Sequence, residues 1–190
     1  MIKRISLAFI LLNLIWSAIA FFVDYKVIGN IPFYFWPFTI ICPLFPFLLF
    51  ILWLREHFRK NTRDLWLSLF SIPPIAYFFG SLIYYPYWML QNGFNLYAFG
   101  QIFWVAFYGI QGIWFSIKRK NDLKYDLVAI SYIVISFIIQ YFGETYGYFD
   151  TSNISNLAMA IIYALIVLLT LAIVLAKRYI NIPSPLFSKR

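Results

Sequence analysis

The feature that most limits the fold of this chain is a series of six long apolar stretches. Each stretch holds at least 17 residues without an Asp, Glu, Lys, Arg or His side chain. A helix of about 20 such residues crosses the hydrocarbon core of a bilayer, whereas a water-soluble domain of this size has too little interior to hide them all. The six stretches are residues 5–23, 38–54, 65–90, 96–117, 127–143 and 154–176.

The composition agrees with a membrane protein. Charged residues make up 12% of the chain and the mean hydropathy is +0.79, whereas about 25% of the residues of a soluble domain are charged. We therefore predict an all-α fold: an integral membrane bundle of six transmembrane helices in one domain at residues 1–180, followed by a flexible cytoplasmic tail at 181–190. The third stretch contains Pro73-Pro74, where we expect a kink or a tilt.

The positions of the basic residues predict the orientation of the bundle. Of the 15 Lys and Arg residues, 14 lie in the two terminal segments and in the second and fourth connections. Short connections rich in Lys and Arg stay in the cytoplasm, so we expect both termini inside (N-in, C-in) and the protein in the cell membrane. Topology and contact with anionic headgroups account for the net charge of +8, and we favour them over a nucleic-acid partner. The 14 residues are Lys3, Arg4, Arg55, Arg59, Lys60, Arg63, Lys118, Arg119, Lys120, Lys124, Lys177, Arg178, Lys189 and Arg190.

The first stretch has a second interpretation. Lys3-Arg4, an apolar run and Ala18-Ile19-Ala20 together have the pattern of a secretory signal with its cleavage site. Signal cores hold about 7–15 apolar residues, and this run is longer and continues through Val23. We therefore expect the segment to be retained as a transmembrane helix. Its cleavage would leave five spans with unchanged sidedness.

Polar side chains inside the stretches recur at helical spacing. A polar group in hydrocarbon needs a partner, so the helix face that carries it turns inward. Two interpretations stay open: the polar faces bond the helices to one another, which we favour, or they line a path through the bundle. The path would consist of Asn13, Ser17, Gln101, Tyr108, Gln111 and Gln140, and its outer mouth of Asp24, Glu144 and Asp150.

Two further patterns concern helix packing. Gly109 and Gly112 in the fourth stretch would let a neighbouring helix approach closely. Polar residues spaced by sevens fall on one face of the last stretch and continue to the residue after it. They are Asn156, Tyr163, Thr170 and Lys177.

The reactive side chains argue against most enzymatic chemistry. The single histidine, His57, is expected to be a solvated residue of a basic loop, which excludes paired-histidine haem ligation and a multi-histidine metal site within one chain. No histidine stands near a core serine such as Ser81, and the helix cores lack the carboxylates that a proton relay needs. We predict no catalytic residue, metal or cofactor and favour a non-enzyme, while an interfacial site on Asp24, Glu144 and Asp150 stays open.

Several short motifs resemble a known family over roughly residues 13–143. They are Trp36-Pro37-Phe38 with Cys42-Pro43, the first-helix residues Asn13, Ser17 and Ala20, the loop Phe58-Arg59-Lys60-Asn61, Gln111, and Phe142-Gly143. By these motifs the chain resembles the YpjA-like family of small polytopic membrane proteins of bacteria and archaea. It departs from that family at Ile41, where the family has Asp, and it lacks the family's membrane histidines and acidic residues around Val105 and residues 134–136. The function of the family is unknown, so the resemblance implies a polytopic membrane protein without a particular activity.

Three functions fit these observations. We place first a small transporter-like or carrier protein with a polar path, then a non-catalytic accessory subunit of a larger membrane complex such as a respiratory one, then a lipid-modifying enzyme at the outer interface. The expected partners are membrane lipids and either a second copy of the chain or other members of a membrane complex. A continuous polar cavity would favour the carrier if it joined Asn13, Gln101, Gln111 and Gln140 to Asp24, and a dry, tightly packed core would favour the subunit.

Overall fold

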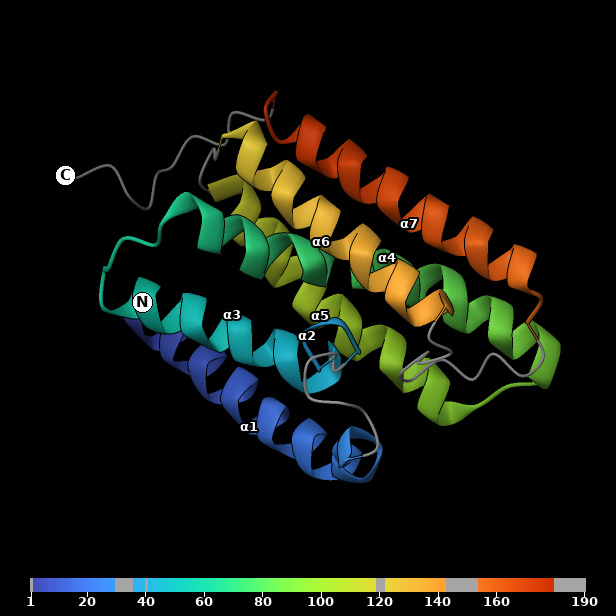
Figure 1. The fold of residues 1–190 in the computed structure, drawn as a ribbon. Coiled ribbons are helices and arrows are strands. Elements are labelled where there is room, and N and C mark those ends of the chain that lie inside the picture. The colour runs from blue at the N-terminus through green and yellow to red at the C-terminus, as the bar shows by residue number, and fades with distance from the viewer. Residues whose placement is uncertain (1, 30–35, 40, 119–121, 143–153, 180–190) are drawn as a thin grey trace.

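The chain forms an all-α bundle in the computed structural model (Figure 1). The structure describes residues 2–29, 36–39, 41–118, 122–142 and 154–179. Within these ranges there are six long helices and one short helix. In chain order they are α1 (Ile2–Gly29), α2 (Trp36–Thr39), α3 (Ile41–His57), α4 (Asp64–Asn92), α5 (Leu96–Lys118), α6 (Leu123–Phe142) and α7 (Asn156–Ala176).

The long helices coincide with the six predicted stretches and differ from them at their ends. α1 continues past Val23 to Gly29, because no glycine or proline interrupts the chain before that residue. The second stretch begins later than predicted, since residues 36–39 form the separate helix α2. α6 begins at Leu123 instead of Leu127, so its first turn includes Asp126. This last difference decides where that carboxylate lies.

Four of the described helices, α4, α5, α6 and α7, are long and apolar enough to cross a membrane. The other two long helices offer shorter apolar segments. α3 has 17 residues in all, and in α1 the apolar segment whose side chains the structure describes is Ser6–Phe22. By the length and composition of its described helices, the chain therefore has the character of a multi-pass membrane protein.

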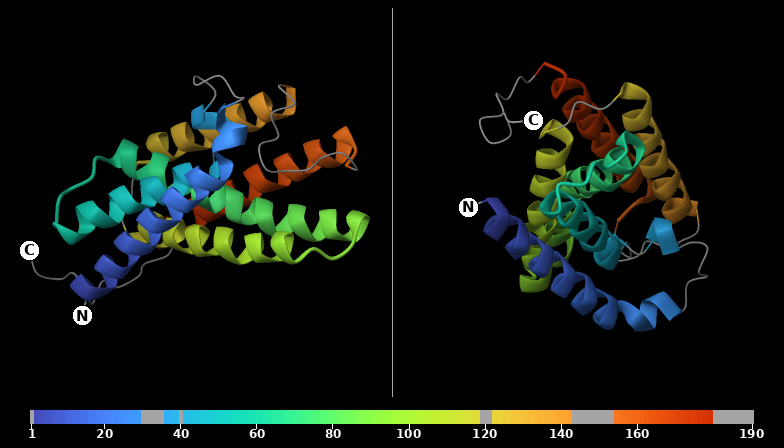
Figure 2. Two further views of the ribbon diagram at one scale, coloured as in Figure 1. Left: turned by 90° about the horizontal axis from the view of Figure 1, so that it is seen from below. Right: turned by 90° about the vertical axis from the view of Figure 1, so that its left-hand side faces the viewer.

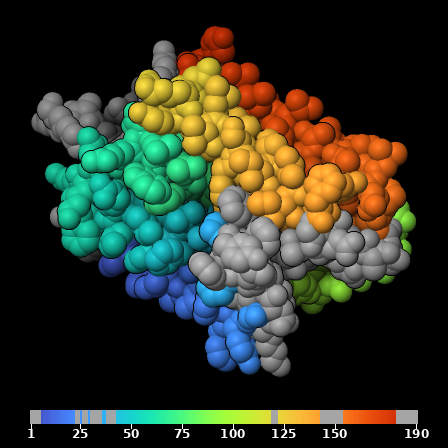
Figure 3. Space-filling model, in the orientation of Figure 1, coloured from blue at the N-terminus to red at the C-terminus, as the bar shows by residue number. Residues whose placement is uncertain are grey.

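α4 is the central helix of the bundle. It contacts α3, α5, α6 and α7. Of its most apolar 18-residue segment, 61% is buried inside the bundle, compared with 28% to 39% for the same segment in α5, α6 and α7. Pro73 and Pro74 lie in the middle of the buried face, and the helix continues across them without interruption. α1 packs on α3 at the outside of the bundle (Figure 2), and α6 and α7 lie side by side on the face shown in Figure 3.

Two glycines of α5 let this helix lie directly against α4. A Cβ atom on Gly109 would lie 2.3 Å from the Cβ of Phe78, and one on Gly112 would lie 2.4 Å from the carbonyl oxygen of Ser71. Neither distance is possible between real atoms, so only glycine permits this spacing of the two backbones. The close helix approach predicted from Gly109 and Gly112 is confirmed.

The described segments that carry most of the basic residues gather at one end of the bundle, which we call the basic end. Figure 1 shows the N-terminus, the α3–α4 connection and the end of α7 at this end, and the α4–α5 connection at the opposite end. Side-chain contacts join the helix ends there, namely Ser6–His57 between α1 and α3, Glu56–Lys118 between α3 and α5, and Ser116–Lys177 between α5 and the residue after α7.

At the opposite end, a short turn joins α4 to α5. Gly93 follows α4 with φ 87°, and its N–H donates to the Met89 carbonyl at 2.9 Å. The Asn95 side chain then accepts a hydrogen bond from the Ala98 N–H at 3.0 Å and so caps α5. A glycine and a side-chain cap together permit this abrupt reversal.

Candidate functional site

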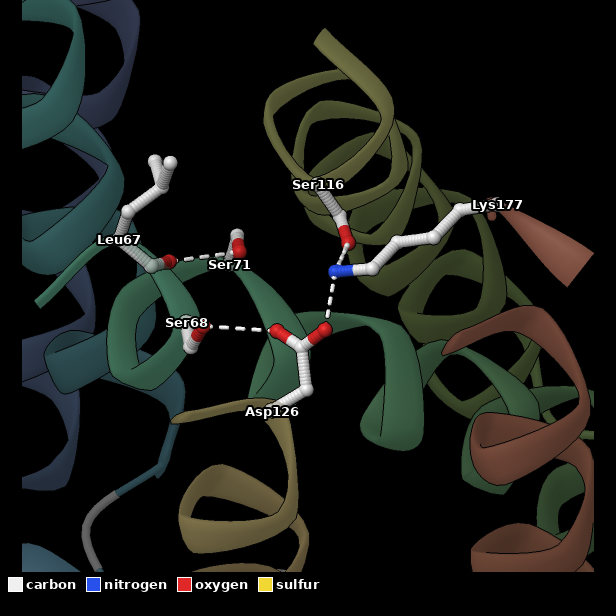
Figure 4. Close-up of polar contacts among 6 residues, drawn as sticks. All are labelled: Leu67, Ser68, Ser71, Ser116, Asp126 and Lys177. Atoms are coloured by element: carbon white, nitrogen blue, oxygen red, sulfur yellow. Dashed lines mark hydrogen bonds and ion pairs between the residues drawn. The ribbon is translucent and has the colours of Figure 1, made fainter. Parts of the chain in front are cut away.

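A buried ion pair lies between four helices at the basic end (Figure 4). The Lys177 ammonium is 2.6 Å from Oδ2 of Asp126, and the two side chains are 2% and 0% exposed. Ser68 of α4 donates to Oδ1 of the same carboxylate at 2.7 Å, and Lys177 also donates to Ser116 of α5 at 3.2 Å. The cluster of Ser68, Ser116, Asp126 and Lys177, which we call the charge cluster, therefore connects α4, α5, α6 and the end of α7.

The helix ends explain why these two charges are tolerated here. Asp126 lies in the first turn of α6, where the peptide dipoles favour a negative charge, and Lys177 follows the last turn of α7, where they favour a positive one. The N–H of Lys177 still donates to the Ile173 carbonyl at 2.9 Å, so the helical path carries the lysine into the bundle. Each charge is thus stabilised by its helix as well as by its partner.

The placement of these charges corrects two predictions. The predicted stretches leave Asp126 in the fourth connection and Lys177 in the C-terminal segment, and the helix cores were predicted to lack carboxylates, whereas both side chains are buried in the bundle. The prediction for Asp126 is wrong because α6 begins four residues earlier than expected. The burial of Lys177 could have been predicted from the face on which polar residues recur every seven positions. On this face Tyr163 and Thr170 are buried as well, whereas Asn156 is exposed.

A second polar group, the tyrosine cluster, joins α4 to α6 farther from the basic end. It consists of Tyr77, Ser136 and Gln140, which are buried. The Tyr77 hydroxyl lies 3.2 Å from the Ser136 hydroxyl, and the Gln140 amide donates to these two hydroxyls at 2.9 Å and 3.1 Å. One amide therefore binds two side chains on two helices.

Buried isoleucines stand between the positions of the charge cluster and the tyrosine cluster along α4 and along α6. Along α6, Asp126 and Ser136 are about 15 Å apart at 1.5 Å per residue, and the completely buried Ile133 lies between them. Ile72 of α4, between the positions of Ser68 and Tyr77, is completely buried in the same core. We call Ile72 and Ile133 the isoleucine layer.

A third polar group, the amide cluster, joins α1, α3 and α5. The amide oxygen of Gln111 accepts hydrogen bonds from Asn13 and from the Trp53 indole, each at 2.8 Å. The two amide side chains also donate to carbonyls of their own helices, Asn13 to Phe9 at 2.8 Å and Gln111 to Phe107 at 3.2 Å. The sequence singled out both amides, but not Trp53, because an indole in an apolar helix carries no signal of its hydrogen-bond partner.

The residues predicted to form a polar path belong to more than one hydrogen-bonded group. Asn13 and Gln111 meet in the amide cluster, whereas Gln140 belongs to the tyrosine cluster. Ser17 donates to the Pro43 carbonyl at 2.8 Å and so joins α1 to α3. Gln101 is half-buried and makes no hydrogen bond with another described residue, and Tyr108 is buried in the core among α1, α3 and α5.

The predicted outer mouth lies outside the described side chains. Asp24 belongs to α1 by its backbone only, and Glu144 and Asp150 fall in the undescribed range 143–153. Among the described residues, no three His, Cys, Asp or Glu side chains come together as a metal site would require.

His57 lies in a different environment from the solvated loop that the sequence predicts. It is the last residue of α3, is half-buried, and its Nδ1 lies 2.9 Å from the hydroxyl of the buried Ser6. Next to it, Glu56 forms an ion pair with Lys118, whose ammonium also lies 4.6 Å from the centre of the Trp114 ring. The prediction that no histidine would lie near a buried serine is wrong, because α1 begins close to the end of α3.

An apolar groove of about 1040 Å³ lies along the second half of α1, between this helix and α2 and α3. Its walls include Leu14, Phe21, Trp36 and Phe47. Ser17 also lines it, and its hydroxyl is already bonded to Pro43. The groove therefore offers apolar surface with little polar character.

Comparisons with known proteins identify no relative of this chain: no protein family, curated protein or solved structure matches it.

Proposed function

We propose that this chain is a six-span integral protein of the cell membrane with both termini in the cytoplasm. The gathering of the described basic segments at one end of the bundle supports this topology, because Lys and Arg in short connections are retained on the cytoplasmic side. The resemblance to the YpjA-like family is part of this proposal, and it adds a polytopic architecture but no activity.

The burial pattern of α1 supports its retention as one of the six spans. Ser6 and Asn13 are buried against other helices, whereas Leu7, Leu11 and Ile15 are 48%, 49% and 56% exposed. A helix with polar residues inward and large apolar residues outward is suited to lipid on its outer face. At 1.5 Å per residue, its 28 residues cover about 42 Å, more than the hydrocarbon thickness.

Cysteine labelling tests this topology. In a Cys42→Ser background, which removes the only cysteine, Asn61→Cys places one thiol in the α3–α4 connection and Phe94→Cys places one in the α4–α5 turn. Both positions are exposed. A membrane-impermeant maleimide should label Phe94→Cys on intact cells and Asn61→Cys only after permeabilisation. Labelling of both thiols on intact cells, or the reverse order, would refute the topology.

Within this topology, we propose that the protein acts as a non-catalytic accessory subunit of a membrane complex. The observation that carries this proposal is that three groups of buried polar side chains, the charge, tyrosine and amide clusters, bond to one another across helices. Interhelical hydrogen bonds of this kind stabilise a fixed helix arrangement in lipid. The close contact of α4 with α5 at Gly109 and Gly112 also favours a static bundle.

The buried charge cluster favours a second candidate, the carrier. Charged residues inside a membrane bundle are rare and often mark the path of a substrate or an ion. For such a protein to transport, water or substrate would have to pass the isoleucine layer between the charge and tyrosine clusters. The lipid-modifying enzyme receives no comparable support, since the side chains of Asp24, Glu144 and Asp150 lie outside the described residues.

Water access to the isoleucine layer distinguishes the two candidates. A thiol reacts with a water-soluble methanethiosulfonate only where water reaches it, so Ile133→Cys, in the Cys42→Ser background, reports on this layer. A fixed bundle in native membranes leaves Ile133→Cys unmodified, while Asn61→Cys reacts as a positive control. Modification of Ile133→Cys at a rate near that of Asn61→Cys would overturn the subunit proposal and favour the carrier.

The subunit proposal also predicts a defined assembly. Extraction from native membranes in a mild detergent should yield a particle that contains the 22.6 kDa chain and other polypeptides in fixed ratio. An untagged strain provides the control for adventitious capture. A chain that migrates only as a monomer would contradict this role without affecting the topology.

A further inference from the structure

The basic residues described at the basic end differ in whether they have a partner inside the protein. Three lysines form ion pairs with carboxylates, namely Lys118 with Glu56, Lys124 with Asp122 and Lys177 with Asp126. Arg59, Lys60 and Arg63 are exposed, and their side chains form no hydrogen bond or ion pair with another described residue. These three cations all belong to the connection between α3 and α4.

Hydrogen bonds hold this connection in a defined shape. Arg55, in the last turn of α3, donates to the Thr62 hydroxyl at 3.0 Å and to the Asn61 carbonyl. The Lys60 N–H in turn donates to the Arg55 carbonyl at 2.8 Å. The Arg55 side chain therefore bonds within the connection, whereas Arg59, Lys60 and Arg63 are exposed on a backbone that these hydrogen bonds hold in place.

Exposed aromatic side chains lie on both sides of the three cations. Phe58 is 63% exposed and Trp66 is 49% exposed. Aromatic rings at the ends of transmembrane helices favour the level of the lipid headgroups. The one carboxylate in residues 58–66, Asp64, lies in the first turn of α4, where the helix dipole favours it. The segment thus combines a net positive charge with rings suited to the membrane interface.

We propose that residues 58–66 form a binding surface for anionic phospholipid headgroups of the cytoplasmic leaflet, with Arg59, Lys60 and Arg63 contacting the phosphates. This inference rests on the proposed topology, which places the connection at the cytoplasmic surface. A connection this short keeps its cations close to the ends of two membrane helices, within the range over which an anionic leaflet attracts Lys and Arg. The internally paired Lys118, Lys124 and Lys177 contribute less, because a carboxylate already neutralises each of them.

Lipid association in vesicles tests this surface. The full chain is reconstituted in phosphatidylcholine vesicles that contain a trace of spin-labelled phosphatidylglycerol or spin-labelled phosphatidylcholine, and the motionally restricted fraction of each label is measured. The wild-type protein should prefer the anionic label, and each free cation should contribute about two- to fivefold to the preference. The preference should fall at 1 M salt, because the Debye length there is only about 3 Å.

Two lysines provide a matched comparison. Lys60→Gln removes an exposed lysine without a described carboxylate partner, and Asp122→Asn/Lys124→Gln removes an exposed lysine together with its carboxylate partner, which lies 3.4 Å away. Lys60→Gln should lower the preference, whereas Asp122→Asn/Lys124→Gln should leave it unchanged. The combined variant Arg59→Gln/Lys60→Gln/Arg63→Gln should lose most of it, and Arg59→Lys/Arg63→Lys should retain it.

Two results would overturn the proposal: a combined variant with the wild-type preference, or equal losses for Lys60→Gln and Asp122→Asn/Lys124→Gln. The assay detects lipid in both leaflets, so its outcome does not depend on which side of the membrane the connection faces. A failure of the topology in the maleimide experiment therefore remains distinguishable from a failure of the lipid-binding surface.

Discussion

The Lys177 ammonium lies 2.6 Å from the Asp126 carboxylate, and this ion pair joins the first turn of α6 to the residue that follows α7. Both side chains are buried, and Ser68 and Ser116 supply further hydrogen bonds from α4 and α5. Two charges and two hydroxyls therefore connect four helices at the basic end. Because the opposite charge is the main compensation for burying each one, the pair acts as a unit.

Removing one member of this pair should destabilise the protein strongly. We expect Asp126→Leu or Lys177→Met to lower the free energy of unfolding by about 3–5 kcal/mol, since each leaves an uncompensated buried charge. The double variant should be more stable than the sum of the two single effects predicts, because no buried charge remains. Thermal or denaturant unfolding in detergent measures all three.

The exposed pair of Lys124 and Asp122 provides the control for the ion-pair experiment. Its side chains are 67% exposed, so Lys124→Gln should change stability by less than about 1 kcal/mol. Strictly additive effects of Asp126→Leu and Lys177→Met would contradict the coupling of the two residues.

Substitution of the glycines between α4 and α5 should separate these helices. Gly112→Ala places a methyl group against the Ser71 carbonyl, and Gly109→Ala places one against Phe78. We expect each change to cost about 1–3 kcal/mol through overpacking. Gly100→Ala in the same helix is the matched control, since a methyl group there would have no described neighbour within 4 Å beyond the adjacent residues and the backbone of its own helix, and it should be neutral or slightly stabilising. Equal behaviour of Gly112→Ala and Gly100→Ala in an unfolding assay would refute the close contact.

Loss of the amide cluster should loosen α1 from the rest of the bundle. Gln111→Leu removes the oxygen that accepts hydrogen bonds from Asn13 and Trp53. We expect it to lower the free energy of unfolding by about 1–2 kcal/mol, because each lost bond contributes roughly 0.6 kcal/mol and the donors left unpaired add to the loss. Gln101→Leu, also in α5, removes an amide without a described hydrogen bond and should change stability little. Limited proteolysis or hydrogen exchange of α1 should show increased opening for Gln111→Leu alone.

The turn between α4 and α5 should depend on Gly93. Its φ of 87° and ψ of 167° belong to a region that is accessible almost only to glycine. Gly93→Ala should therefore cost about 1–3 kcal/mol through backbone strain, although nothing lies within 4 Å of the added methyl group. A wild-type unfolding midpoint for this variant would mean that the turn relaxes to another conformation.

Local sequence patterns were sufficient to predict the six long helices and several features of their packing. Uninterrupted apolar residues predicted the helices, and the glycine pair predicted a close approach of another helix to α5, because both depend on the properties of neighbouring residues. That this helix is α4 came from the structure. The ends of α1 and α6 were less predictable. A helix can continue through charged residues such as Asp126 when tertiary contacts compensate for them, and no local signal reveals those contacts.

The sequence by itself determined that this chain forms apolar helices suited to a membrane, and that most of its positive charge lies in alternate connections. Only the tertiary structure decided which polar groups meet: Asp126 with Lys177, Gln111 with Asn13 and Trp53, and His57 with Ser6. The physical reason is that helix formation and hydropathy depend on nearby residues. Hydrogen bonds and ion pairs between helices depend on the rotation and depth of each helix, which the packing of the whole bundle sets.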